Sequence, residues 1–198
     1  MSGVIVLGGS FDPPHRGHCE LVEYAKAHAA EVWVVPCGDR TDKHVLSPAL
    51  LRLELARVAF PDCTILDIEV QHGPMIPTYF LMKQLEEHDS RVQFLLATDL
   101  LPTLKDWEEP ERLVSEVNFI VAPRPGATVA PDVLAEFRQR RNFSFIDSQL
   151  ETTQVSSTWV RNTVRRLGNP EAIRAGLDGL VPAAVAELII SHRLYTED

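Results

Sequence analysis

The chain has 198 residues and a hydrophobic fraction of 45%, which is enough apolar side chain for the core of one compact domain. Its 28 acidic and 19 basic residues give a formal net charge of -9. An acidic surface repels a phosphate backbone, so this balance excludes nucleic acid as the main partner. We expect a single domain over residues 1–198.

Cysteine usage and hydropathy bear on the compartment. Cys19, Cys37 and Cys63 are odd in number and match no paired ligand spacing, so neither a disulfide framework nor a zinc ribbon is indicated. No apolar run approaches the length that a bilayer span needs. These features predict a cytoplasmic protein with no membrane partner.

Short β-branched runs alternate with longer amphipathic stretches along the chain, which is typical of βαβ units. The predicted strands are Val4–Leu7, Val32–Val35, Thr64–Ile68, Val92–Ala97, Asn118–Ala122 and Ser144–Ile146. The predicted helices are Gly17–Ala29, Pro48–Ala59, Thr78–Glu87, Pro131–Arg140, Thr158–Leu167 and Pro182–His192. The pattern predicts an α/β fold, a mostly parallel sheet flanked by helices.

Ligands of such sheets bind beyond the carboxyl ends of the strands. Three unusual segments occupy that position: Gly8–His18 after the first strand, Thr98–Asp99 after the fourth, and Val155–Arg161 after the last. We expect the functional residues in these segments.

In the first segment, Gly8 and Gly9 let backbone N–H groups approach a phosphate closely, but no GxGxxG follows, so this is not a dehydrogenase fingerprint. His15 and His18 stand three residues apart where a helix begins, and this spacing suits a phosphate clamp at the positive helix end. A tight turn, structural histidines and half of a metal site are the alternatives, although zinc would need further ligands.

The last segment places hydroxyl groups at a helix start and the Arg161 guanidinium one turn later. Taken alone, it is explained by an N-cap followed by a solvated arginine. Taken with the first segment, it predicts an anion site with two walls, because both segments follow strands and both open helices.

The residues at these positions resemble a known family. Gly-Gly-Ser-Phe-Asp-Pro-Pro-His-Arg-Gly-His at residues 8–18 is similar to the HxGH motif of the nucleotidylyltransferase superfamily, in the form found in nicotinate/nicotinamide mononucleotide adenylyltransferases. Val155–Arg161 resembles that family's second signature, Ile-Ser-Ser-Thr-x-x-Arg. The resemblance covers nearly the whole chain. It implies a single-domain Rossmann-like nucleotidylyltransferase fold.

The implied activity is adenylyl transfer from ATP to nicotinamide or nicotinate mononucleotide, giving NAD or deamido-NAD and pyrophosphate in NAD biosynthesis. The implied catalytic residues are His15, His18 and Arg161. The implied ATP-binding residues are Gly8, Gly9, Ser10, Phe11, His15, His18, Asp99, Ser156, Ser157, Thr158 and Arg161. The implied mononucleotide-binding residues are Ser10, Phe11, Lys43, Thr78, Tyr79 and Trp107, with Trp107 stacking on the pyridine ring.

The reaction needs no enzyme base, because a phosphomonoester with a second pKa of about 6 is already largely dianionic at pH 7. Mg²⁺ bridging the ATP phosphates is expected from the chemistry, but no carboxylate cluster offers a protein ligand. We therefore expect alignment and charge stabilisation to supply the catalysis.

Other functions remain open. The chain could activate a different phosphate, as a pantetheine-phosphate adenylyltransferase or a cytidylyltransferase does, or it could be a non-catalytic ATP-sensing module. The sequence also leaves a homo-oligomer open. Trp107 is flanked by Asp106, Glu108 and Glu109, and these carboxylates predict that the nicotinamide form is used at least as well as the anionic nicotinate form.

Overall fold

The computed structural model describes residues 3–40, 45–124, 126, 128–146 and 155–196. Its strands form one six-stranded sheet in the order β3-β2-β1-β4-β5-β6, and every neighbouring pair is parallel. The strand bounds are β1 Val4–Gly9, β2 Glu31–Pro36, β3 Thr64–Ile65, β4 Val92–Ala97, β5 Phe119–Ala122 and β6 Phe143–Phe145. The prediction of an α/β fold with a parallel sheet is confirmed.

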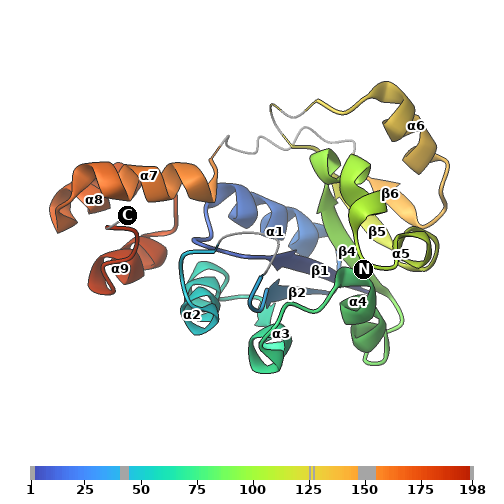
Figure 1. The fold of residues 1–198 in the computed structure, drawn as a ribbon, viewed down its shortest axis with the longest axis horizontal. Coiled ribbons are helices and arrows are strands. Elements are labelled where there is room, and N and C mark those ends of the chain that lie inside the picture. Colours follow the sequence, from blue (N-terminus) through green and yellow to red (C-terminus); the bar gives the residue numbers. More distant parts are fainter. Residues whose placement is uncertain (1–2, 41–44, 125, 127, 147–154, 197–198) are drawn as a thin grey trace.

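Helices cover both faces of the sheet (Figure 1). Their bounds are α1 Arg16–His28, α2 Ala49–Ala59, α3 Ile68–His72, α4 Thr78–Glu86, the 3-10 helix η1 Thr98–Asp106, α5 Pro110–Glu116, α6 Pro131–Arg138, α7 Ser157–Leu167, α8 Pro170–Leu177 and α9 Ala183–Ser191.

Alternation along the strands divides the core into two layers, because successive side chains of a strand point to opposite faces. Ile5 and Leu7 of β1 pack with buried residues of α1, α2, α7, α8 and α9. Val4 and Val6 pack on the other face with buried residues of α4, η1, α5 and α6. Both faces of β1 are therefore buried, which explains its continuous apolar sequence.

The predicted strand Thr64–Ile68 is wrong in its second half, since β3 ends at Ile65 and α3 begins at Ile68. The turn into α3 brings the carboxylate of Glu69 into the interior, where it accepts a hydrogen bond from the N–H of Gly38 at 2.9 Å. The prediction missed α3, η1, α5 and α8. The other predicted elements agree with the structure to within one or two residues at each end.

The strand order fixes where a ligand can bind. From β1 the chain runs to β2 and β3 on one side, and from β4 it runs to β5 and β6 on the other. The connections therefore leave in opposite directions between β1 and β4, and such a reversal opens a crevice at the carboxyl ends of the strands. Gly8–His18 begins in the last two residues of β1 and continues beyond it, and Thr98–Asp99 follows β4 directly.

Candidate active site

The turn after β1 is built from close contacts between glycine backbone and aromatic rings. A Cβ atom on Gly8 would lie 3.1 Å from the ring of Phe94, and one on Gly9 would lie 3.1 Å from the ring of Phe11. Phe11 is 1% exposed and has a φ of 50°, a left-handed conformation that is unusual for a bulky residue. Strain of this kind is characteristic of functional sites.

His15 and His18 meet at the start of α1. The backbone N–H of His15 donates to Nδ1 of His18 at 3.2 Å, and the two ring centroids are 3.8 Å apart. The ring of Phe11 packs edge-on against His18, with centroids 5.2 Å apart. His15 is 7% exposed, and its Nδ1 is buried without a hydrogen-bond partner within the described part of the chain. Burial, reinforced by the positive charge of Arg124, lowers the pKa of His15 to about 4.

The start of α7 is hydrogen-bonded to the same turn. The hydroxyl of Ser157 donates to the carbonyl of Pro13 at 2.9 Å, and Nη1 of Arg161 donates to the carbonyl of Asp12 at 2.7 Å. A second guanidinium nitrogen of Arg161 donates to Oγ1 of Thr158 at 3.1 Å, and the hydroxyl of Ser156 caps the helix by accepting from the N–H of Trp159. The two predicted walls are thus in contact across the site.

Asp12 belongs to the motif and had no role in the sequence analysis. Its carboxylate is 4% exposed and accepts hydrogen bonds from the N–H of Leu46 at 2.8 Å and from the hydroxyl of Tyr195 at 2.7 Å. The hydroxyl of Ser47 donates to the Tyr195 oxygen at 3.1 Å. Asp12 therefore joins the turn after β1 to the segment before α2 and to the last part of the chain.

Asp99 is the second residue after β4, and Arg124 is the second residue after β5. Nη1 of Arg124 donates to Oδ2 of Asp99 at 3.0 Å, and its backbone N–H donates to the hydroxyl of Thr98 at 3.3 Å. Oδ1 of Asp99 is buried and finds no partner among the described residues. Arg124 also acts electrostatically on His15, so the site contains a basic residue that the sequence analysis missed. Its position two residues after a strand was the available signal.

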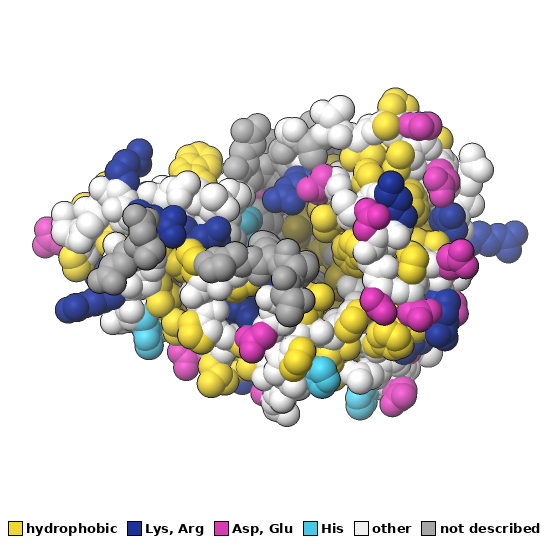
Figure 2. Space-filling model, in the orientation of Figure 1, with side chains coloured by type: hydrophobic (Ala, Val, Ile, Leu, Met, Phe, Trp, Pro, Cys, Tyr) yellow, Lys and Arg dark blue, Asp and Glu magenta, His cyan; other side chains and the backbone are white. Residues whose placement is uncertain are grey.

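A hollow opens in the molecular surface at this end of the sheet (Figure 2). A histidine and a neighbouring pair of basic and acidic side chains lie at its edge. Of these groups, the histidine and the basic side chain can donate hydrogen bonds to an anion.

The predicted mononucleotide residues are spread over four segments, of which the turn after β1 with Ser10 and Phe11 is described above. Thr78 opens α4, shortly after Gly73–Met75, which pairs with Asp39 beyond the end of β2. Tyr79 points into the layer beneath α4, where its hydroxyl donates to Glu116 at 2.9 Å. Trp107 ends η1 half-buried, and its indole N–H donates to the hydroxyl of Thr103 at 3.1 Å. Lys43 lies outside the described residues.

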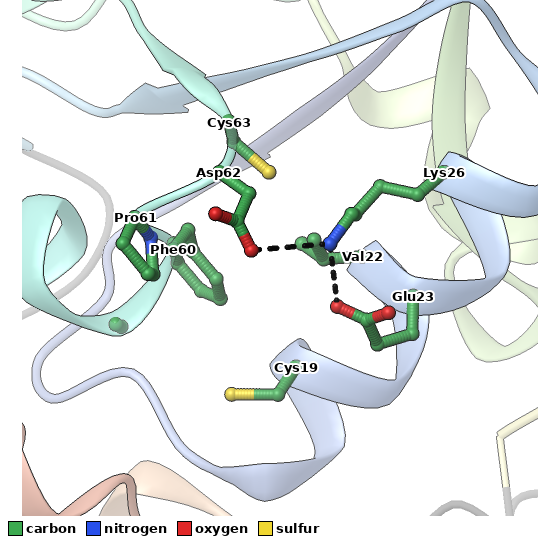
Figure 3. A pocket seen from close by; sticks show the side chains of 9 residues that line it. Cys19, Val22, Glu23, Lys26, Phe60, Pro61, Asp62 and Cys63 are labelled. Atoms are coloured by element: carbon green, nitrogen blue, oxygen red, sulfur yellow. Dashed lines mark hydrogen bonds and ion pairs between the residues drawn. The ribbon is translucent and has the colours of Figure 1, made fainter.

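A separate cavity of about 40 Å³ lies between α1 and the turn after α2 (Figure 3). It is lined by Cys19, Val22, Glu23, Lys26, Ala59, Phe60, Pro61, Asp62 and Cys63. The ammonium of Lys26 bridges Glu23 at 3.0 Å and Asp62 at 3.4 Å. This volume holds a few water molecules at most and is too small for a nucleotide.

Within the described ranges, no three His, Cys, Asp or Glu side chains are grouped so that they could hold a metal ion. No helix there is long and apolar enough to cross a membrane.

Comparison with known proteins identifies the family. The model of the cytidylyltransferase-like family matches residues 6–163. A protein of Dehalococcoides mccartyi, named as a probable nicotinate-nucleotide adenylyltransferase, is 32% identical over 96% of this chain and 95% of its own length. The chain belongs to the nicotinate-nucleotide adenylyltransferase family. A protein of Bordetella avium with the same description is 30% identical over 98% of both chains.

Solved structures of this family share the fold. Nicotinic acid mononucleotide adenylyltransferase of Plasmodium falciparum, complexed with NaAD, superposes with a TM-score of 0.79 at 23% identity, over 100% of this chain and 99% of that one. A putative nicotinate-nucleotide adenylyltransferase of Vibrio parahaemolyticus superposes with a TM-score of 0.67 at 18% identity, over 100% of this chain and 98% of that one. The Rossmann-like nucleotidylyltransferase fold implied by the motifs is confirmed.

Proposed function

We propose that this protein transfers AMP from ATP to nicotinate mononucleotide, forming deamido-NAD and releasing pyrophosphate in the biosynthesis of NAD. One observation carries the proposal: the starts of α1 and α7 are joined through the bonds of Ser157 and Arg161 to the backbone of Pro13 and Asp12. The start of α7 and the guanidinium of Arg161 thus lie against the turn that opens α1. Such a convergence of donors suits a polyphosphate.

His15 binds phosphate as a neutral group. Its pKa of about 4 leaves the imidazole uncharged at pH 7, so one ring nitrogen donates a proton in a hydrogen bond and the other accepts. His18 and Arg161 supply further donors, and Arg161 carries the fixed positive charge that a growing charge on the phosphate oxygens requires.

Asp99 contributes an acceptor to the same site. Arg124 holds one of its oxygens, while the other is buried and without a protein partner in the described part of the chain. A hydroxyl of the nucleotide ribose would satisfy this oxygen. Mg²⁺ enters with ATP as part of the substrate, and we assign it no protein ligand.

The reaction forms a bond between an oxygen of the mononucleotide phosphate and the α-phosphorus of ATP, while the bond from that phosphorus to the pyrophosphate oxygen breaks. The attacking phosphate is already ionised, so no protein group has to remove a proton. The protein holds the two substrates in line and stabilises the charge on the leaving oxygens.

We favour nicotinate mononucleotide as the acceptor because the relatives are named for it. The carboxylates that flank Trp107 gave the opposite expectation, but the structure weakens its basis. Asp106 and Glu108 are exposed, so water and salt screen their charges, and Glu109 lies 3.7 Å from the guanidinium of Arg112. The local potential at Trp107 is therefore less negative than the sequence alone indicates.

A pyrophosphate-release assay tests the function. The purified protein with MgATP should turn over nicotinate mononucleotide with a kcat/KM at least as high as that for the nicotinamide form, and should release no pyrophosphate with phosphopantetheine. The variant His18→Ala should lose two to three orders of magnitude in kcat, roughly the effect of removing one transition-state donor. Binding of ATP without pyrophosphate release would instead identify a nucleotide sensor.

A further inference from the structure

The largest fully buried side chain is an arginine, and the sequence analysis gave it no role. Arg52 lies in the first turn of α2 and is 1% exposed. Arginine is rarely buried to this degree, because removing its charge from water is costly unless partners replace the lost hydration. Packing alone therefore does not explain an arginine at this position.

The guanidinium of Arg52 donates to four backbone carbonyl groups from three segments. Nη1 reaches Ser10 at 3.0 Å and Cys37 at 2.7 Å, Nη2 reaches Gly38 at 3.0 Å, and Nε reaches Ser47 at 3.1 Å. Ser10 follows β1, Cys37 and Gly38 follow β2, and Ser47 precedes α2. One side chain thus fixes the two strand ends and the entry to α2 relative to one another.

A second buried charge holds the same backbone from the other side. The carboxylate of Glu69, which is 4% exposed, accepts from the N–H of Gly38, whose carbonyl is bound by Arg52. The site leaves no room for a side chain at residue 38, where a Cβ atom would clash with the carbonyl oxygens of Gly73 and Glu69. Burial raises the pKa of Glu69, while the positive charge of Arg52 is among the groups that oppose this rise.

The bond to Ser10 has a consequence for the substrate. In a trans peptide the C=O and the next N–H point in opposite directions, so a Ser10 carbonyl directed at Arg52 turns the N–H of Phe11 away from the protein interior. Within the described part of the chain this N–H donates to no protein acceptor. Phe11 is the strained residue that precedes Asp12 and contacts His18, so its N–H lies at the centre of the turn.

We propose that Arg52 is a positioning residue for adenylyl transfer, which holds the Ser10–Phe11 peptide so that the Phe11 N–H donates to a phosphate oxygen at the junction of the two substrates. This inference rests on the proposed function. A buried hydrophobic side chain of similar size would stabilise a core at least as well as a buried charge does. An arginine at this position is explained by its four bonds to carbonyl groups, because these bonds fix the position of the Ser10–Phe11 peptide.

The variant Arg52→Lys tests the role, because an ammonium keeps the charge but cannot span four carbonyls in a planar fork. Its control is Arg57→Lys on the same helix, whose guanidinium is 55% exposed. We expect Arg52→Lys to lower kcat by roughly a hundredfold, as a misplacement of about 1 Å does. The Kd for α,β-methylene ATP should stay within threefold, and Arg57→Lys should match the parent. A purely structural arginine would shift the urea midpoint and leave kcat per folded molecule unchanged, which would overturn the proposal.

A measurement on the parental protein covers the case in which Arg52→Lys does not fold. The amide proton resonance of Phe11 should move downfield when α,β-methylene ATP and nicotinate mononucleotide are added together, because a phosphate oxygen accepts from it. An unmoved resonance in a protein that releases pyrophosphate would refute the positioning role alone. A parent that releases no pyrophosphate would refute the proposed function itself.

Discussion

The neutral, buried His15 makes the stability of the nucleotide-free protein depend on pH. An unfolded chain protonates this imidazole near its ordinary pKa of 6.5, whereas the folded protein does so only at about 4. Between these values the unfolded state binds a proton that the folded state does not, so stability falls as the pH is lowered through this window. Above 6.5 and below 4 the two states bind equally, and the contribution of His15 no longer changes.

The size of this effect follows from the two pKa values. Each pKa unit between the states corresponds to about 1.4 kcal/mol, so the full window is worth about 3 kcal/mol, of which ~2.5 kcal/mol is lost by pH 4.5. The side chain is 7% exposed, so water screens its charge little. A loss of this size is a large fraction of the stability of an ordinary domain.

Urea unfolding without nucleotide, at pH 7.0 and at pH 4.5, measures this loss of unfolding free energy. The parent should lose ~2.5 kcal/mol more between these pH values than His15→Asn, which cannot titrate there. His192→Asn, at an exposed position after α9, controls for the loss of a surface histidine and should follow the parent. If the parent and His15→Asn run parallel to within about 0.5 kcal/mol, the buried neutral imidazole is refuted.

Three further predictions concern the same site. Arg161→Lys should lower kcat/KM by roughly 10- to 100-fold, because an ammonium cannot replace the bidentate hydrogen bonding of a guanidinium. Arg165→Lys, one turn along α7, is its control and should leave steady-state kinetics unchanged. Tyr195→Phe removes the donor to buried Asp12 and should lower the urea-derived unfolding free energy by roughly 1.5 to 3 kcal/mol; a change below about 0.5 kcal/mol would contradict the bond. The rate at limiting mononucleotide should rise with pH through about 6 and then level off, and an acceptor analogue with a lower phosphate pKa should move that inflection down with it.

Sequence patterns located the strands well because parallel strands are buried on both faces. Val4–Leu7 and Val92–Ala97 are nearly continuous in apolar character, and both lie in the centre of the sheet. The missed helices lack such a pattern. The segment of η1 is short, polar at its start and interrupted by Pro102, and α8 follows the end of α7 so closely that Asn169 and Pro170 were not read as a new helix start.

Some residues of the candidate site could be predicted from a local sequence pattern, whereas others depend on tertiary contacts. His15 and His18 stand out in one short segment and Arg161 in another, because the spacing of each at a helix start is visible locally. Arg52 carries no such signal, because an arginine on an amphipathic helix is expected to face water. Its burial is tolerable only because carbonyl groups after β1, after β2 and before α2 accept its hydrogen bonds. Arg124 was hidden by the adjacent prolines, which indicate a surface turn.

The buried charges of Asp12 and Arg52 show how the fold holds a strained turn in place. Asp12 binds that turn to the segment before α2 and to Tyr195. Arg52 binds Ser10, the residue before Phe11, to the end of β2. A left-handed phenylalanine persists only where its surroundings over-determine it. The bond of Arg52 to Ser10 and the bonds of Asp12 fix the residues on either side of Phe11 and supply that constraint. The cost of burying both charges is therefore consistent with a site whose catalysis depends on alignment rather than on a proton-transferring base.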